Sequence, residues 1–195
     1  MKPKRFSAAF GLAVSFTVVT PAFGSDTLIK FEDGVGSQPF RSANGVPVPN
    51  VVAGVSPGGA PWVIQSLKAT VTTNGEIRAS GTGLLLAGTD NIATRGGPRQ
   101  VVASLFCRNA PVPPATVGTV QTEPFNSEFV DLDASGDFKI DGSLTNVSGA
   151  IPPADCGDKM DNRPVLLIRT VTPANPTTGA PAAPGAWFAA GIVKD

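Results

Sequence analysis

The sequence contains no histidine and no tyrosine, and only two of its 195 residues are cysteine. Histidine is the side chain most often used for acid–base catalysis near neutral pH, and it is the commonest metal ligand in proteins. Its absence excludes Ser–His and Cys–His catalytic sites, and two cysteines without histidine cannot complete a zinc site unless carboxylates join them. The sequence therefore favours a non-catalytic protein, in which carboxylates, lysines and serines remain for any chemistry.

One short motif matches a catalytic pattern but lacks what the catalysis needs. Residues 54–58 read G-x-S-x-G, the pattern around the nucleophile of α/β-hydrolases. No histidine exists to activate Ser56, and Pro57 lacks the backbone N–H that this position supplies to the oxyanion hole. We interpret the segment as a Gly/Pro turn, and the sequence predicts no catalytic residue.

Charge is scarce, since only 15% of the residues are charged. No run of Lys and Arg interleaved with aromatic residues occurs, so we expect no nucleic-acid partner. Helical spacing of apolar residues is also missing after the N-terminus, whereas Gly (22) and Pro (19) are abundant between short apolar runs. This composition is typical of an all-β protein with many turns.

The N-terminus has the features of a secretory signal peptide. Lys2, Lys4 and Arg5 precede an apolar stretch over residues 6–19 and a small-residue exit at residues 22–24. The stretch is shorter than the about 20 residues of a membrane-spanning helix, which is the alternative interpretation. We predict a signal peptide over residues 1–24 and a secreted or periplasmic mature chain without a membrane span. Without those three cations the chain carries 12 basic (15 − 3) and 15 acidic residues.

Export also bears on the two cysteines. An oxidising compartment favours a disulfide between Cys107 and Cys156, the only pair available. Such a bond would close a long loop and stabilise the fold by roughly 4 kcal/mol in the chain-entropy model. The alternative is two buried thiols.

Residues 25–195 are predicted to form a single all-β domain of eight or nine strands with long Pro/Gly-rich loops. We expect an antiparallel β-sandwich, with a Greek-key barrel as the alternative. Residues 32–36 are expected to form a turn and residues 164–168 a central strand that is covered on both faces. The segments expected to form strands, some of them as hairpins, are 27–31, 46–55, 62–65, 67–83, 100–107, 129–144, 164–168 and 187–193.

Alternation of apolar and polar residues fixes the register of the hairpin at residues 67–83. A two-residue turn at Asn74 and Gly75 would place Val71 opposite Arg78, which puts an apolar and a charged side chain on one face. A three-residue loop instead pairs Val71 with Ile77. We therefore predict a loop at residues 73–75, in which Gly75 takes a positive φ and closes a G1 bulge.

The second hairpin, at residues 129–144, follows the same pattern. Matching Val130 and Leu132 to Phe138 and Ile140 again requires a three-residue loop, at residues 134–136, with Gly136 in the bulge position. In this register Asp133 faces Asp137, and Asp131 faces Lys139. Asp131, Asp133 and Asp137 are all expected to project into solvent, because Leu132 and Phe138 must point into the core.

The acidic segment of this hairpin resembles the start of an EF-hand calcium loop. Asp131, Asp133 and Ser135 occupy its first, third and fifth positions, Gly136 its sixth, and Asp137 follows as a further acidic residue. The twelfth position is glycine instead of the bidentate Glu, and strands replace the flanking helices. Asp131, Asp133 and Asp137 are therefore candidate ligands of a weak calcium site, and a plain hairpin without a cofactor is the alternative.

Taken as a sequence, the chain is best interpreted as an exported, non-catalytic β-protein that acts as a binding or structural module at or outside the cell surface. Its partner would be a protein, a glycan or a small molecule. Two alternatives stay open. One is a carboxylate-based hydrolase that uses Asp131, Asp133 and Asp137. The other is a protein that self-associates through exposed strand edges into a homo-oligomer or a surface layer.

Overall fold

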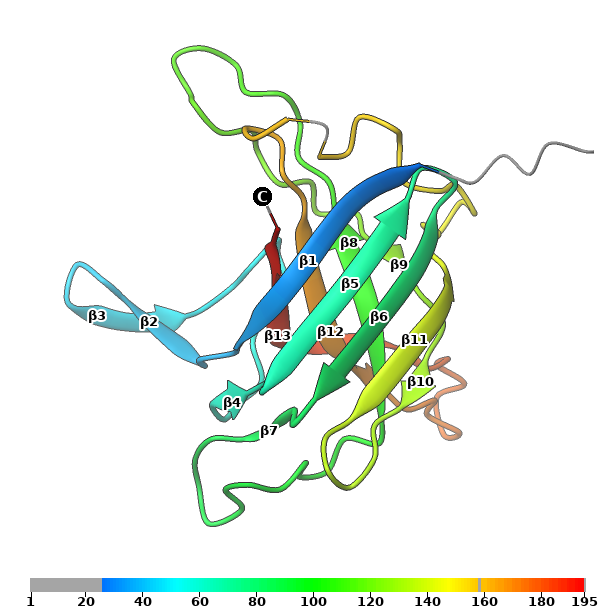
Figure 1. The fold of residues 1–195 in the computed structure, drawn as a ribbon. Helices are drawn as coiled ribbons and strands as arrows, with labels where there is room; N and C mark the ends of the chain where they lie inside the picture. Colours follow the sequence, from blue (N-terminus) through cyan, green and yellow to red (C-terminus); the bar gives the residue numbers. More distant parts are fainter. Residues whose placement is uncertain (1–25, 158, 195) are drawn as a thin grey trace, which may run out of the picture.

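The computed structural model describes residues 26–157 and 159–194, and all regular elements in these ranges are β-strands (Figure 1). The predicted signal peptide, residues 1–24, lies outside the described residues. The strands are β1 (Thr27–Gly36), β2 (Phe40–Ala43), β3 (Val46–Pro49), β4 (Trp62–Val63), β5 (Ser66–Thr72), β6 (Glu76–Thr82), β7 (Leu85–Leu86), β8 (Gln100–Phe106), β9 (Phe125–Asn126), β10 (Val130–Asp131), β11 (Phe138–Ser143), β12 (Val165–Thr172) and β13 (Ala183–Val193).

Nine strands form one antiparallel sheet in the order β10-β8-β12-β13-β1-β5-β6-β11, with β9 also paired to β8. The sheet curls so far that it becomes a nearly closed barrel (Figure 1). Asn126 in β9 pairs with Thr145, just after β11, and this bridge helps to join the two ends of the sheet. The predicted antiparallel all-β fold is confirmed.

The barrel interior is filled by the apolar half of the alternating strands. On β5 and β6, every second residue is buried and its neighbours are half-buried or exposed. Burial of one Leu or Ile side chain contributes about 1.5–3 kcal/mol, so this interior is the main source of stability. The largest fully buried members of this cluster are Phe31, Leu67, Ile77, Leu84, Leu105, Leu132, Ile140, Leu144, Leu166 and Ile168.

A second apolar cluster lies on the outside of the barrel and consists of Phe106, Leu167 and Trp187. Residues 50–58 cover it: Trp187 Nε1 donates a hydrogen bond to Asn50 O at 3.1 Å, and Pro57 forms a parallel bridge with Trp187. The side chains of β12 are therefore buried on both sides of the sheet over residues 166–168. The predicted central strand is confirmed, and it extends further, to Thr172.

The register of the first hairpin is as predicted. Val71 pairs with Ile77 and Ala69 with Ala79, and three residues separate β5 from β6. Gly75 has φ +81, and its amide donates a hydrogen bond to Thr72 O at 3.0 Å. A positive φ is costly for residues with a Cβ atom, which is why glycine is required there.

The second hairpin is only partly as predicted. Its loop is correct: the Asp133 amide donates to Asp137 O at 3.1 Å and Gly136 has φ +79. Its arms, however, separate into different ladders, because β10 pairs with β8 and β11 pairs with β6. Asp131 therefore pairs with Gln100, and the predicted pairing of Asp131 with Lys139 is wrong.

Two further expectations are corrected. Residues 32–36, expected to be a turn, continue β1, and a bulge at Asp33 (φ 65) lets the strand keep pairing with β13. The Asp-Gly pair has turn chemistry, but pairing with β13 outweighs it. The sequence also did not reveal strand β2, which pairs with β3 across a turn at Asn44 and Gly45.

The predicted disulfide between Cys107 and Cys156 is confirmed, with Cα atoms 5.2 Å apart. It ties the end of β8 to the connection between β11 and β12. Within the described ranges, no helix is long and apolar enough to cross a membrane.

Candidate functional site

Asp133 anchors its own turn. Its Oδ1 accepts hydrogen bonds from the backbone amides of Ser135 at 2.8 Å and Asp137 at 2.9 Å. This is the local bonding that makes aspartate common in turns. The carboxylate is exposed, as the sequence predicted.

Asp137 makes a contact between segments far apart in the chain. Its Oδ1 accepts a hydrogen bond at 2.9 Å from the amide of Gly83, at the end of β6, and the adjacent Leu84 amide donates to Gly136 O at 2.9 Å. The side chain is half-buried, so the expectation that it would project into solvent is wrong. Asp137 thus fastens the turn to the connection that leads into β7.

Asp131 stays exposed on β10, where Gln100 Nε2 lies 3.5 Å from its Oδ1. In residues 26–157 and 159–194, no three His, Cys, Asp or Glu side chains form a group that could hold a metal ion. Backbone hydrogen bonds account for the positions of Asp133 and Asp137 without an ion. The calcium site stays a prediction.

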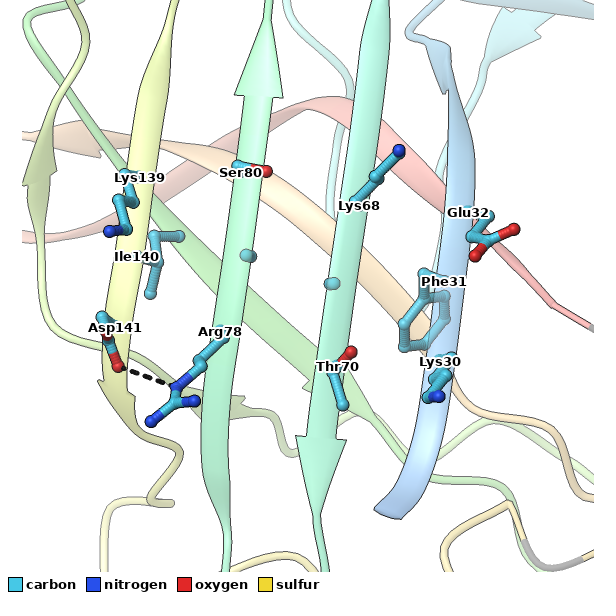
Figure 2. A pocket seen from close by; sticks show the side chains of 12 residues that line it. Lys30, Phe31, Glu32, Lys68, Thr70, Arg78, Ser80, Lys139, Ile140 and Asp141 are labelled. Carbon is cyan, nitrogen blue, oxygen red and sulfur yellow. Dashed lines mark ion pairs between the residues drawn. The ribbon is translucent and has the colours of Figure 1, made fainter.

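A different surface brings six charged side chains together, on the outer face of β1, β5, β6 and β11 (Figure 2). We call it the cationic face. Strand pairing aligns its side chains in two rows across the four strands. The first row contains Lys30, Thr70, Arg78 and Asp141, and the second contains Glu32, Lys68, Ser80 and Lys139.

The cationic face is hollow because its side chains differ in length. Thr70 on β5 and Ser80 on β6 are short and lie diagonally across the two central strands, while the surrounding lysines and arginine are long. The hollow is open and shallow, with a volume of about 460 Å³, and the sheet at Ala69 and Ala79 forms part of its floor. Strands lie about 4.8 Å apart, so cations two strands apart are separated by about 10 Å at the backbone.

Four cations and two carboxylates line the hollow, a local excess of +2 (4 − 2), whereas the chain after residue 24 carries three more acidic than basic residues (15 − 12). Arg78 Nε lies 3.5 Å from Asp141 Oδ1, and both side chains are largely exposed. Among the described residues, Lys30, Lys68 and Lys139 form no salt bridge. The face therefore offers three ammonium groups to a ligand.

Glu32 is occupied by a cation from a neighbouring strand. Lys194, which follows β13, donates a hydrogen bond to Glu32 Oε1 at 2.5 Å. This bond holds the pKa of Glu32 below its ordinary value against the opposing effect of desolvation, and the charges of Lys194, Lys68 and Lys30 assist it. Glu32 is thus anionic at neutral pH, and Lys194 offsets its charge.

The chemistry available on this face is recognition of anions. Lysine ammonium groups provide charge and three donors each, and the hydroxyls of Thr70 and Ser80 can donate or accept hydrogen bonds. The two carboxylates of the face, Glu32 and Asp141, each have a cationic partner.

Half of this surface follows from the sequence alone. The register of the first hairpin already placed Lys68, Thr70, Arg78 and Ser80 on the polar side of the sheet. It could not reveal that β1 and β11 flank this hairpin and bring Lys30 and Lys139 beside it. The signal in the sequence is the polar half of the alternation, which by itself does not distinguish a binding face from ordinary solvent-facing surface.

Comparison of the chain with models of protein families, with curated proteins and with solved structures finds no match, so the site is interpreted from its geometry alone.

Proposed function

We propose that this chain is an exported, non-catalytic binding protein whose cationic face holds an acidic polysaccharide at or outside the cell surface. Export is supported by the signal-like residues 1–24 and by the disulfide, which suits an oxidising compartment.

The observation that carries the proposal is the set of three lysines without a carboxylate partner around a polar hollow. Lys30, Lys68 and Lys139 come from three different strands, so the fold and not a local run of sequence brings them together. Each exposed ammonium group attracts an anion only weakly in water. Several of them acting on one polyanion give a useful affinity that falls with salt.

The shape and lining of the hollow favour a polysaccharide over other anions. The hollow is open and crosses four strands, which fits an extended chain with repeated carboxylate or sulfate groups. Thr70 and Ser80 supply hydroxyl groups for sugar hydroxyls. The one aromatic residue in the lining, Phe31, is only 1% exposed, so the face offers no ring for stacking on nucleic-acid bases.

The proposal is tested by binding of the purified protein to alginate, to heparin and to uncharged dextran at low and high salt. We expect binding to the acidic polymers that weakens steeply between about 0.05 and 0.5 M salt, because the Debye length falls below 10 Å in this range. The double variant Lys68→Glu/Lys139→Glu should weaken binding at least about tenfold, equivalent to ~1.4 kcal/mol.

A matched control separates the cationic face from net charge. Arg99 and Lys159 are also exposed but do not line the hollow, and Arg99→Glu/Lys159→Glu changes the net charge of the chain equally. We expect this control to bind within about twofold of the natural chain, which is near 0.4 kcal/mol. Equal loss in both double variants, or equal binding of dextran, would refute the proposal.

A further inference from the structure

The hairpin of β2 and β3 forms a separate two-stranded sheet that extends away from the barrel (Figure 1). It carries exposed apolar side chains: Phe40 is 62% exposed and Val46 is 60% exposed. We infer that this hairpin is a dimerisation element, in which β2 pairs antiparallel with β2 of a second copy of the chain.

In an antiparallel hairpin, residues that bond to the partner strand alternate with residues whose N–H and C=O groups point outward. This alternation determines which backbone groups of the hairpin are unused. Asn44 (φ 52) and Gly45 (φ 79) form the two-residue turn, so Ala43 and Val46 are the hydrogen-bonded pair that closes it. The Asn50 amide donates to Pro39 O at 3.1 Å, so Pro39 and Asn50 are also a hydrogen-bonded pair, as the alternation requires at the other end of the hairpin. On β2, the N–H and C=O groups of Phe40 and Ser42 therefore point away from β3. Among the described residues, no backbone group bonds to them.

The two edges of the hairpin are not equivalent. On β3, the residues whose backbone groups point away from β2 are Pro47 and Pro49, because they pair with Ser42 and Phe40. Proline has no N–H to donate. The outer edge of β3 therefore cannot accept another strand in a regular ladder. Only β2 has an open edge, so pairing through β2 would stop at two copies and could not extend into a fibre.

The exposed edge is complementary to itself, which is why a second copy is the occupant we propose. In a two-fold pair centred on Phe40, the outward groups of Phe40 bond those of Phe40 of the partner subunit. Ser42 in turn bonds Gln38 of the partner subunit, and the reverse, which requires the new ladder to extend two residues before β2, past the bend at Pro39. Two of the about six backbone hydrogen bonds then lie within the regular strand, and two exposed aromatic rings come together.

Other registers are less favourable. A pair centred on Arg41 would place Arg41 directly opposite Arg41 of the partner subunit, and like charges at directly opposed positions are destabilising. A pair centred on Ser42 would place Phe40 opposite Asn44 of the partner subunit, where the chain has already turned. The Phe40-centred register avoids both problems, since Arg41 then lies opposite Pro39 of the partner subunit.

Ser42 provides a matched pair of variants. Ser42→Pro removes the outward N–H but leaves the hairpin's own ladder intact, whereas Ser42→Ala keeps the N–H and removes only the hydroxyl. Sedimentation of the natural chain should show a monomer–dimer equilibrium at concentrations below about 1 mM, the weak end of specific association. Ser42→Ala should behave like the natural chain, and Ser42→Pro should raise the dissociation constant at least about tenfold, or ~1.4 kcal/mol.

Hydrogen exchange shows whether Ser42→Pro leaves the hairpin folded. The Arg41 and Ala43 amides bond to β3, so they should stay protected in this variant, while protection of the Phe40 amide should rise with concentration only in the natural chain and in Ser42→Ala. Opening the other edge by Pro47→Val/Pro49→Thr should give species larger than dimers. A natural chain that is monomeric up to about 1 mM, or equal dimerisation by both Ser42 variants, would overturn the inference.

Discussion

Two of the turn glycines differ in what surrounds them, and this difference can be measured. Gly136 and Gly149 share φ +79, but a Cβ atom on Gly136 would lie 2.6 Å from Leu84 O, whereas a Cβ atom on Gly149 would meet nothing within 4 Å. Gly149→Ala should therefore cost about 1 kcal/mol from backbone strain alone. We expect Gly136→Ala to cost at least about 2 kcal/mol, because backbone atoms must also move.

Urea unfolding of both variants at one temperature measures the comparison. Strain common to the two sites cancels, so the difference reports the contact of the turn with Leu84. Equal losses of unfolding free energy would show that this turn is not packed as described.

The contact of Glu32 with Lys194 predicts a pH effect at one residue. The hydrogen bond from Lys194 lowers the pKa of Glu32, so the carboxylate favours the folded state above its ordinary pKa and loses this contribution as pH falls through the lower, folded value. Carboxyl NMR titration should give Glu32 a pKa below 4.5, its ordinary value. In Lys194→Met the pKa should rise, while Lys159→Met, with the charge removed elsewhere, should leave it unchanged.

At the scale of elements, the loop of the second hairpin, residues 134–136, is held against the barrel by the hydrogen bond that Asp137 accepts from the Gly83 amide. Asp137→Ala removes the acceptor for the half-buried Gly83 amide, and leaving such a donor without a partner costs about 1–3 kcal/mol. Asp137→Asn keeps an oxygen that can accept this bond and should recover most of the loss. Thermal and urea unfolding of both variants measures the loss of unfolding free energy. If Asp137→Asn loses as much as Asp137→Ala, the stabilisation comes from the charge of Asp137 and not from the hydrogen bond.

For the whole molecule, the disulfide between Cys107 and Cys156 is the one covalent link between distant segments. It should stabilise the chain by about 4 kcal/mol in the chain-entropy model, because it closes a long loop. The double variant Cys107→Ala/Cys156→Ala should lose about this much unfolding free energy. Thiol labelling of the denatured, unreduced natural chain should find no free cysteine, and stoichiometric labelling would contradict the bond.

Closure of the barrel was beyond local sequence patterns. Alternation predicted that Val130 and Phe138 lie in strands, and turn chemistry predicted the loop between them. The two arms then pair with β8 and β6, at opposite ends of the sheet, because the curl of the sheet brings these ends together. The position of Asp131 depended on that closure, which is why its predicted partner was wrong.

The sequence by itself determined most of the strands, though not β2 or the second half of β1, and it determined which side of the predicted strands is apolar and that Gly75 and Gly136 must adopt a positive φ. These properties are local, since alternation and turn geometry act over a few residues. Only the tertiary structure decided that Lys30, Lys68 and Lys139 share a face and that β2 keeps an open edge. Both depend on which strands become neighbours, and that choice is made by burial of the whole apolar surface at once.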